Sequence, residues 1–393
     1  MPRLRSIGLT PLQRFLPILS ATVVLAVLAA GAPAAPSSAR LVKGIYDETQ
    51  VLYGNPDRTF PMLKQLGTKA IRVNLYWGGR FGASIAPPSG LSPEQPENFD
   101  WSLYDRVVTY AARFGIQVYF SIYGTPDWAN ADQGLNVPPR QFKALENFAF
   151  IAATRYGGRF FTDEGIRLPA VTHWIAWNEP NNPLFLKNQF KRRAGRWVIQ
   201  SAIDYAKICN AVVAGVRRAR IESGARRSQV ACGVTGPRGN NIAASFRPSV
   251  SPIPFVRAMK AAGATGFDAY AHHPYYGNPS ETPSTPPSSR QAITLGNIDV
   301  LIAEVTRLWG AKRIWITEYG YQTNPPDRVF GVPPKTQAKY LAQAWAIAKK
   351  NPRIDTFFWF LLRDENRLQG WQSGLLNKSS VRKPSFSTFR ALR

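Results

Sequence analysis

The stretch THWIAWNEPNN (residues 172–182) passes from a short apolar run into a polar cluster. The run 173–177 is typical of a strand that is buried on both faces of a parallel sheet. Glu179 follows it directly, between Asn178 and Pro180. A polar side chain at the end of a buried strand is held rigidly by the scaffold below it. The pattern therefore predicts a parallel sheet with a functional site at the carboxyl ends of its strands.

Seven further apolar runs occur along the chain, separated by longer stretches with helical periodicity. They span residues 41–46, 70–76, 117–123, 229–234, 267–273, 313–317 and 356–361. Helices are expected between them, for example over 101–114 and 337–349, and a last one over 385–392. Eight strands alternating with helices predict a single (β/α)8 TIM barrel. The alternative is a doubly wound open sheet, which usually carries a glycine-rich phosphate loop that this chain lacks.

Polar and aromatic residues stand at the ends of several of these runs, and five of them matter most: Arg72, Glu179, His273, Glu318 and Trp359. In a TIM barrel the functional side chains come from the carboxyl ends of several different strands. We therefore expect these side chains to meet on one rim. Long proline-rich loops follow on the same rim at 86–98, 129–139 and 277–290, and the last has the composition of a cleft wall or of an ordinary surface loop.

Two glutamates, Glu179 and Glu318, end the fourth and seventh predicted strands. Two carboxyl groups that face each other across a cleft can cleave a glycosidic bond, one as acid and the other as nucleophile or base. A separation of about 5 to 5.5 Å would give double displacement with retention. A strand-end glutamate is often only a structural ion pair, but two such residues on one rim favour catalysis.

Several motifs resemble the clan A glycoside hydrolases, with family 39 most similar and the family 5 cellulases next. They are WNEP at 177–180 within AWNEPNNPLF, WITEYG at 315–320, FDAYAHHPYY at 267–276, FFWFLL at 357–362 and the closing KPSFSTF. The resemblance extends over residues 41–393. It implies a metal-independent retaining enzyme with no cofactor.

The resemblance also implies roles for single residues. Glu179 would be the general acid/base and Glu318 the nucleophile. Asn178 would bind the 2-hydroxyl of the sugar, while Arg72 and Tyr275 would hydrogen-bond the nucleophile. An arginine beside Glu318 would keep that carboxyl ionised, whereas Glu179 must stay protonated in a less polar setting.

His273 would line the same subsite, whereas its neighbour His272 is out of phase on the strand and should face the helices. His173 begins a strand and is expected to be structural. Among the tryptophans, Trp359 is the strongest candidate for a platform on which a sugar ring stacks. Weaker candidates are Trp77, Trp128 and Trp371, and an ion pair in the loop is the expected role of Asp364 and Glu365.

The N-terminal segment has the layout of a secretory signal. Arginines 3, 5 and 14 precede the apolar run 15–30, and small residues follow at 31–35 with an Ala-x-Ala site at 32–34. We expect a signal peptide over 1–35, a catalytic domain over 36–393 and a secreted protein. An uncleaved membrane anchor is the alternative.

The chain has a net charge of +25, and removal of 1–35 would leave 25 − 3 = +22. Such a charge attracts polyanions, which favours an anionic cell surface or acidic glycan as a partner. No nucleic-acid-binding motif is present. The alternative is that the basic clusters at 191–193, 217–220 and 226–227 are solvated surfaces that keep the protein soluble.

The two cysteines, Cys209 and Cys232, could form a disulfide or remain buried thiols. Together these features predict a monomeric, secreted hydrolase of a β-linked polysaccharide or oligosaccharide. Two alternatives are a transglycosylase that uses the same site and a non-catalytic protein that binds acidic glycan.

Overall fold

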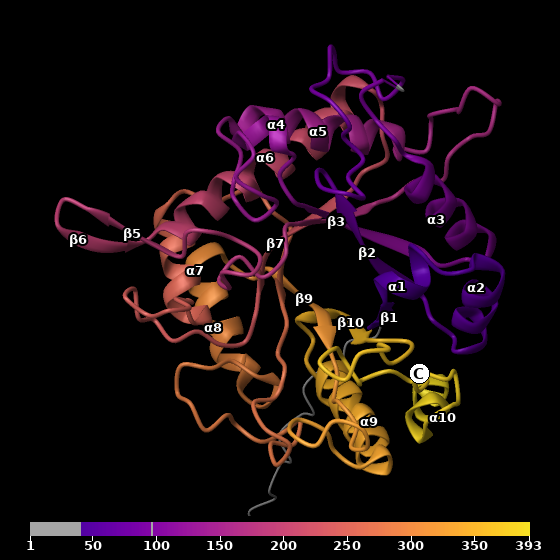
Figure 1. Ribbon diagram of the computed structural model, residues 1–393, viewed down its shortest axis with the longest axis vertical. Helices are drawn as coiled ribbons and strands as arrows, with labels where there is room; N and C mark the ends of the chain where they lie inside the picture. Colours follow the sequence, from indigo (N-terminus) through magenta and orange to yellow (C-terminus); the bar gives the residue numbers. More distant parts are fainter. Residues whose placement is uncertain (1–40, 96) are drawn as a thin grey trace, which may run out of the picture. The chain divides into compact units, whose positions relative to one another are not determined.

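The eight apolar runs pair side by side as parallel strands and close into a barrel (Figure 1). In the computed structural model, which describes residues 41–95 and 97–393, the order around the barrel is β1-β2-β3-β4-β7-β8-β9-β10, and β10 pairs with β1. The strands are β1 (Val42–Tyr46), β2 (Ala70–Tyr76), β3 (Gln117–Tyr123), β4 (His173–Ala176), β7 (Gln229–Thr235), β8 (Ala269–His272), β9 (Arg313–Tyr319) and β10 (Ile354–Phe360). The prediction of a (β/α)8 TIM barrel is confirmed.

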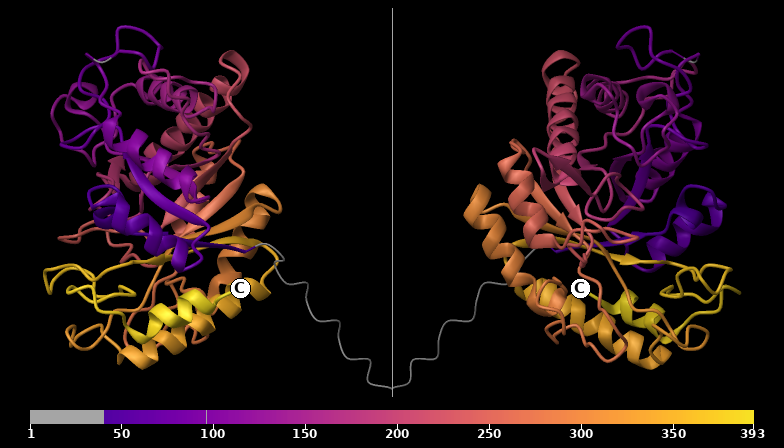
Figure 2. Two further views of the ribbon diagram at one scale, coloured as in Figure 1. Left: turned by 90° about the vertical axis from the view of Figure 1, so that its right-hand side faces the viewer. Right: turned by 60° about the vertical axis from the view of Figure 1, so that its left-hand side comes forward.

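Helices surround the barrel and cover the outer face of its strands (Figures 1 and 2). They turn an apolar stripe inward: α3, for example, buries Tyr104, Val107, Val108 and Ala111, which are spaced three and four apart. The helices are α1 (Glu48–Val51), α2 (Pro56–Gln65), α3 (Ser102–Arg113), α4 (Asp127–Asn130), α5 (Phe142–Arg155), α6 (Gln200–Glu222), α7 (Pro252–Ala261), η1 (Leu295–Asn297), α8 (Ile298–Trp309), α9 (Pro334–Lys350) and α10 (Pro384–Ala391).

Side chains fill the interior of the barrel, because successive residues of a strand point to opposite faces. One buried cluster lies inside the ring and includes Tyr119, Ile175, Trp315 and Phe358. A larger cluster lies between the strands and the helices. The inner cluster gives the open, carboxyl-terminal end of the barrel a solid floor, and the polar residues of the strand ends stand above it.

A two-stranded antiparallel hairpin follows β4 and was not among the expected elements. It consists of β5 (Phe190–Arg193) and β6 (Arg196–Ile199) and projects beyond the helices (Figure 1). Its turn residues, Ala194 and Gly195, both have positive φ, at 45° and 76°. Positive φ at both central positions is the geometry that suits a two-residue hairpin loop.

Cys209 of α6 and Cys232 of β7 form a disulfide. The bond ties the long helix that follows the hairpin to the outer face of the barrel. Of the two states that the sequence left open, the structure has the paired one.

The predicted signal peptide, residues 1–35, lies outside the described residues, so the domain boundary at 36 stays a prediction. Within residues 41–95 and 97–393, none of the helices combines the length and the apolar character that crossing a bilayer requires.

Candidate active site

Arg72 is the centre of a polar layer above the barrel floor. It lies within β2, two residues after the strand begins at Ala70, and is fully buried. Its Nη1 donates to Oε1 of Glu318 at 2.6 Å, and its Nη2 donates to Oδ1 of Asn178 at 2.6 Å. Its Nε donates to the hydroxyl of Ser121 at 3.2 Å. A buried guanidinium needs this many acceptors to offset the loss of water.

Glu318, near the end of β9, is held by two donors, one from β2 and one from the loop after β8. Oε1 accepts from Arg72, and Oε2 accepts from the hydroxyl of Tyr275 at 3.1 Å. Both contacts stabilise an ionised carboxylate, because each donates a proton to an oxygen. The structure thus brings Arg72, Asn178, Tyr275 and Glu318 together, as the sequence predicted.

Glu179 follows β4 and lies in a different environment. Its Oε2 accepts from the amide of Asn182 at 3.1 Å, and its Oε1 lies 3.0 Å from Nδ1 of His273. Within the described residues, no arginine or lysine forms an ion pair with it. Burial raises the pKa of Glu179, and the hydrogen bond from Asn182 and the charge of Arg72 only partly oppose that effect. The two glutamates are therefore inequivalent, one paired with a cation and one buried without such a partner.

His273 stands between the two glutamates. Its Nε2 lies 3.2 Å from Nη1 of Arg72 and 2.9 Å from the hydroxyl of Thr317. A guanidinium can only donate, so Nε2 must accept and the ring proton must sit on Nδ1. That Nδ1–H donates to Glu179. Burial lowers the pKa of His273 to about 3, so the ring is neutral at physiological pH.

The two carboxyl groups face each other closely. One oxygen of Glu179, one oxygen of Glu318 and one ring nitrogen of His273 all lie within 4.8 Å of one another. Three such ligand atoms could also surround a metal ion. However, Arg72 contacts two of the three residues, and its permanent positive charge opposes a second cation there. The arrangement favours proton transfer and nucleophilic attack.

Local backbone strain and one small residue position Glu179. Trp177 and Glu179 have positive φ, at 72° and 32°, which non-glycine residues rarely adopt and which is common at functional sites. Gly236, just after β7, leaves room for the carboxyl group: a Cβ there would lie 2.9 Å from Cδ of Glu179.

Asn181 fixes the loop after β4, which carries Glu179, to the neighbouring loop after β7. It is fully buried and donates to the carbonyls of Gly236 and Val250, at 3.1 and 2.8 Å. Its own Oδ1 accepts from the backbone N–H of Gly236 at 2.8 Å. Neither Asn181 nor Asn182 was singled out from the sequence, although both lie in the motif WNEPNN.

The structure corrects the prediction for Trp359. Its side chain points between the strands and helices, is fully buried, and donates from the indole nitrogen to the carbonyl of Ser373 at 3.0 Å. No ring face remains for a sugar. The next residue, Phe360, is half-buried on the cleft side, with its ring 5.2 Å from those of Tyr46 and Trp371.

Of the other tryptophans, Trp371 lies at the site, 5.1 Å from the ring of Tyr275, and is half-buried. Trp77 is buried in the outer core, and Trp128 packs edge-on against it at 5.7 Å. Trp371 therefore lies beside Tyr275, the residue that donates to Glu318, and Phe360 lies beside Trp371.

The remaining predicted polar residues are structural. His272 hydrogen-bonds Thr235 and the carbonyl of Ile293, away from the cleft. His173 stacks on Tyr119 with ring centroids 4.1 Å apart, at the opposite end of the strands. Asp364 forms the expected ion pair, with Lys383 at 2.7 Å, whereas Glu365 forms none within the described residues.

A third acidic residue, Glu48, lies near the cleft and was missed. Its Oε2 accepts from the hydroxyl of Tyr76 at 3.1 Å, and its buried Oε1 has no partner among the described residues. Burial raises the pKa of Glu48 to about 7; Tyr76 and Arg72 oppose this, while the charges of Asp47 and Glu318 reinforce it. Glu48 opens a one-turn helix, a position without a motif.

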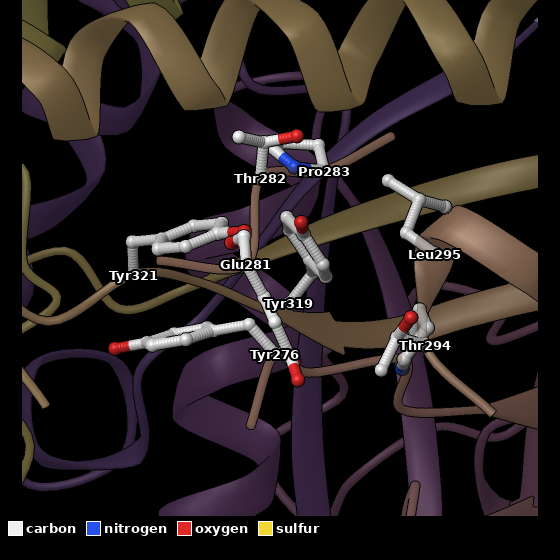
Figure 3. A pocket seen from close by; sticks show the side chains of 9 residues that line it. Tyr276, Glu281, Thr282, Pro283, Thr294, Leu295, Tyr319 and Tyr321 are labelled. Atoms are coloured by element: carbon white, nitrogen blue, oxygen red, sulfur yellow. The ribbon is translucent and has the colours of Figure 1, made fainter. Parts of the chain in front are cut away.

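The loop 277–290 is a packed wall. The hydroxyl of Tyr321 donates to the carbonyl of Glu281 at 2.6 Å, and the rings of Tyr276 and Tyr321 stack at 4.0 Å. The crevice that these residues line with Tyr319 is shown in Figure 3 and has no room for a water molecule. It holds neither Glu179 nor Glu318.

Residues 162–389, more than half of the chain, match the family described as glycosyl hydrolase catalytic core. No curated protein matches the chain. The matched residues include both Glu179 and Glu318.

Solved structures share the fold at low sequence identity. A family 39 glycoside hydrolase from Bacteroides cellulosilyticus has a TM-score of 0.61 and 17% identity, over 90% of this chain and 63% of the other. A glucosidase from Croceicoccus marinus has a TM-score of 0.64 and 12% identity, over 91% and 68%. A GH5_18 protein from Streptomyces cattleya has a TM-score of 0.58 and 14% identity, over 90% and 80%.

The chain thus spans less than two thirds of the family 39 structure. These neighbours include the two families whose motifs the sequence resembles. The family match and the barrel lead to the same conclusion: this chain belongs to the glycosyl hydrolase catalytic core family.

Proposed function

We propose that the protein is a retaining hydrolase of a β-linked polysaccharide or oligosaccharide, with Glu179 as acid/base and Glu318 as nucleophile. One observation carries the proposal: an oxygen of each carboxyl group lies within 4.8 Å of an oxygen of the other. Retaining enzymes place their two carboxyl groups about 5 to 5.5 Å apart, whereas inverting enzymes need about 6.5 to 9.5 Å to admit a water molecule.

In the first step, Glu318 attacks the anomeric carbon while Glu179 gives its proton to the departing glycosidic oxygen. The environments support this division. Arg72 and Tyr275 donate to Glu318 and favour its anion, while burial favours the protonated form of Glu179. A covalent glycosyl-enzyme forms and the leaving group departs with the proton.

In the second step, Glu179, now ionised, takes a proton from water as that water attacks the anomeric carbon. The bond to Glu318 breaks and the carboxylate is restored. His273 donates from Nδ1 to Glu179 and would stabilise this anion. Asn178, oriented by Arg72, is positioned to hold a sugar hydroxyl whose hydrogen bond strengthens in the transition state.

The proposal is tested with purified protein on a panel of polysaccharides and aryl β-glycosides. Glu318→Gln should abolish turnover, and the surface substitution Glu164→Gln should not. NMR of the anomeric proton should show that the first-formed product keeps the β configuration. A product of inverted configuration would disprove retention. A wild-type protein that binds glycan and cleaves none of the panel would support the non-catalytic alternative.

We further propose that residues 1–35 are a secretory signal and that the mature enzyme acts outside the cell. The disulfide between Cys209 and Cys232 supports an oxidising compartment. N-terminal sequencing of protein recovered from the medium tests the cleavage site. Recovery only from membranes, with residue 1 retained, would instead support the anchored alternative.

A further inference from the structure

The loop that carries Glu179 continues into the exposed β5–β6 hairpin, and its charge is one-sided. Residues 180–203 contain five basic residues and no acidic one; the basic residues are Lys187, Lys191, Arg192, Arg193 and Arg196. All five side chains belong to exposed residues. Solvated protein surfaces normally carry positive and negative side chains together. A projecting hairpin that carries only positive side chains therefore points to an anionic partner.

These cations are largely unneutralised. Arg193 donates to the amide oxygen of Gln200 at 2.9 Å, and Gln200 in turn contacts Asp204, the nearest acid along the chain. Within the described residues, Lys191, Arg192 and Arg196 form no ion pair. Their charge is therefore available to a ligand.

An aromatic ring stands among the cations. Trp197 lies directly opposite Arg192 across the hairpin, and the Arg192 guanidinium lies 5.6 Å from the ring. Trp197 nevertheless keeps 51% of its surface exposed. Exposed tryptophan surface matches the apolar face of a pyranose ring, and a guanidinium beside it matches an acidic substituent on that ring.

The hairpin is anchored next to the acid/base. Gln189, just before β5, is buried and donates to the carbonyl of Pro180 at 2.9 Å. Pro180 is the residue after Glu179. Each hairpin strand has four residues, so the element reaches roughly 13 Å from this anchor. A polymer lying along it would start beside the group that protonates the leaving sugar.

The neighbouring loop after β7 has similar character. Asn181 ties it to the Glu179 loop through the carbonyls of Gly236 and Val250. Between these two points, Phe246 and Arg247 are both exposed. An aromatic ring beside a cation thus occurs on two joined loops at the same end of the barrel.

We propose that the β5–β6 hairpin is a binding site for an acidic polysaccharide, whose rings carry carboxylate, sulfate or phosphate groups, and that it directs the chain into the cleft. The binding site itself does not depend on the proposed function; only the hydrolysis of the bound polysaccharide in the cleft rests on it. A lipid surface is a less fitting partner, because the exposed apolar area of the hairpin is a single ring among cations.

The test measures binding without turnover, in the full protein carrying Glu318→Gln. Affinity electrophoresis is run in gels that contain polygalacturonate, dextran sulfate or neutral dextran. One variant replaces Lys191, Arg192 and Arg196 with Gln, and a second is Trp197→Ala. The matched control replaces Arg220, Arg226 and Arg227 with Gln; Arg220 and Arg227 border the cavity of about 830 Å³ at the other end of the barrel. Melting temperatures verify that each variant folds.

We expect the hairpin triple variant to weaken binding to both polyanions by about tenfold and to flatten its salt dependence. Trp197→Ala should weaken binding to polygalacturonate several-fold. The control triple should bind within about twofold of the parent protein. Equal losses in both triples would overturn the proposal, since total charge would then suffice. So would binding to polyanions no stronger than to neutral dextran.

The two proposals fail separately. A protein that binds polygalacturonate through the hairpin but hydrolyses no glycan would overturn the proposed function and keep the binding site. Hydrolysis with retention, together with unchanged polyanion binding in the hairpin variants, would support the proposed function and overturn the binding site.

Discussion

Nη1 of Arg72 lies 2.6 Å from Oε1 of Glu318 in a setting where the guanidinium is fully buried. The same guanidinium orients Asn178 and fixes the tautomer of His273. A planar fork with five donors can serve these partners at once, and a point charge cannot. The geometry of the candidate site therefore depends on one fully buried side chain, which positions Glu318, Asn178 and His273.

Arg72→Lys should keep the charge and lose the fork. We expect kcat/KM to fall by about 100-fold, because Asn178 and His273 lose their common donor. Arg72→Met should also destabilise the fold by about 3 to 5 kcal/mol, since it leaves the buried Glu318 carboxyl without its cation. Steady-state kinetics and urea unfolding measure the two effects. A lysine variant of wild-type activity would contradict this role.

Asn182 should set the alkaline limit of activity. Its amide donates to Glu179, which lowers the pKa of a carboxyl that burial raises. Asn182→Ala removes that donor, so the pKa rises and the acid stays protonated to higher pH. The alkaline limb of the kcat/KM profile should therefore move upward. Asn188→Ala, exposed on the same loop, is the control. An unchanged or lowered limb would argue against Glu179 as the acid.

Gly236 should be intolerant of a side chain. An added Cβ would meet Cδ of Glu179 at 2.9 Å and force the carboxyl group to move. A shift of about 1 Å in a catalytic group can cost about 100-fold in rate. Gly236→Ala should thus lower kcat strongly while the melting temperature changes little. Gly90→Ala, on an exposed loop, serves as the comparison; similar activity of both variants would refute the steric argument.

The disulfide should act on stability and leave catalysis unaffected. Cys209 and Cys232 are 23 residues apart and lie between the barrel and its helices. Closing a loop of this length stabilises a fold by about 3 kcal/mol through the unfolded chain. Replacing both with Ser should lower the free energy of unfolding by about that amount and leave kcat unchanged. Urea titrations with and without reductant provide the check.

The strands could be located from the sequence because parallel barrel strands are buried on both faces and read as plain apolar runs. All eight observed strands fall within about two residues of the predicted runs, a margin usual for element ends. The same property means that the sequence does not show which residues of a strand face the barrel interior and which face the helices. In FFWF at the end of β10 every residue is apolar, so no alternation tells which ring faces the cleft. The sequence favours Trp359 because it is a tryptophan at the end of the eighth strand, but the ring on the cleft side is that of Phe360.

The candidate site divides in a similar way. Glu179, Glu318 and Arg72 carry motifs and strand-end positions, and the structure brings them together. Glu48 has no motif, and it reaches the cleft only because the chain turns into a short helix after β1. The hairpin was missed because its turn has Ala at a position that usually holds Asn or Asp.

Asn181 joins the loops after β4 and β7 through hydrogen bonds between its side chain and the backbone of Gly236, Arg238 and Val250. In consequence the two loops behave as a single part. Replacing one of them with the loop of a relative, in order to change which sugar is accepted, would remove these hydrogen bonds and allow Glu179 to move from its position. Exchanging both together, with the asparagine kept, is the way to transplant specificity onto this barrel.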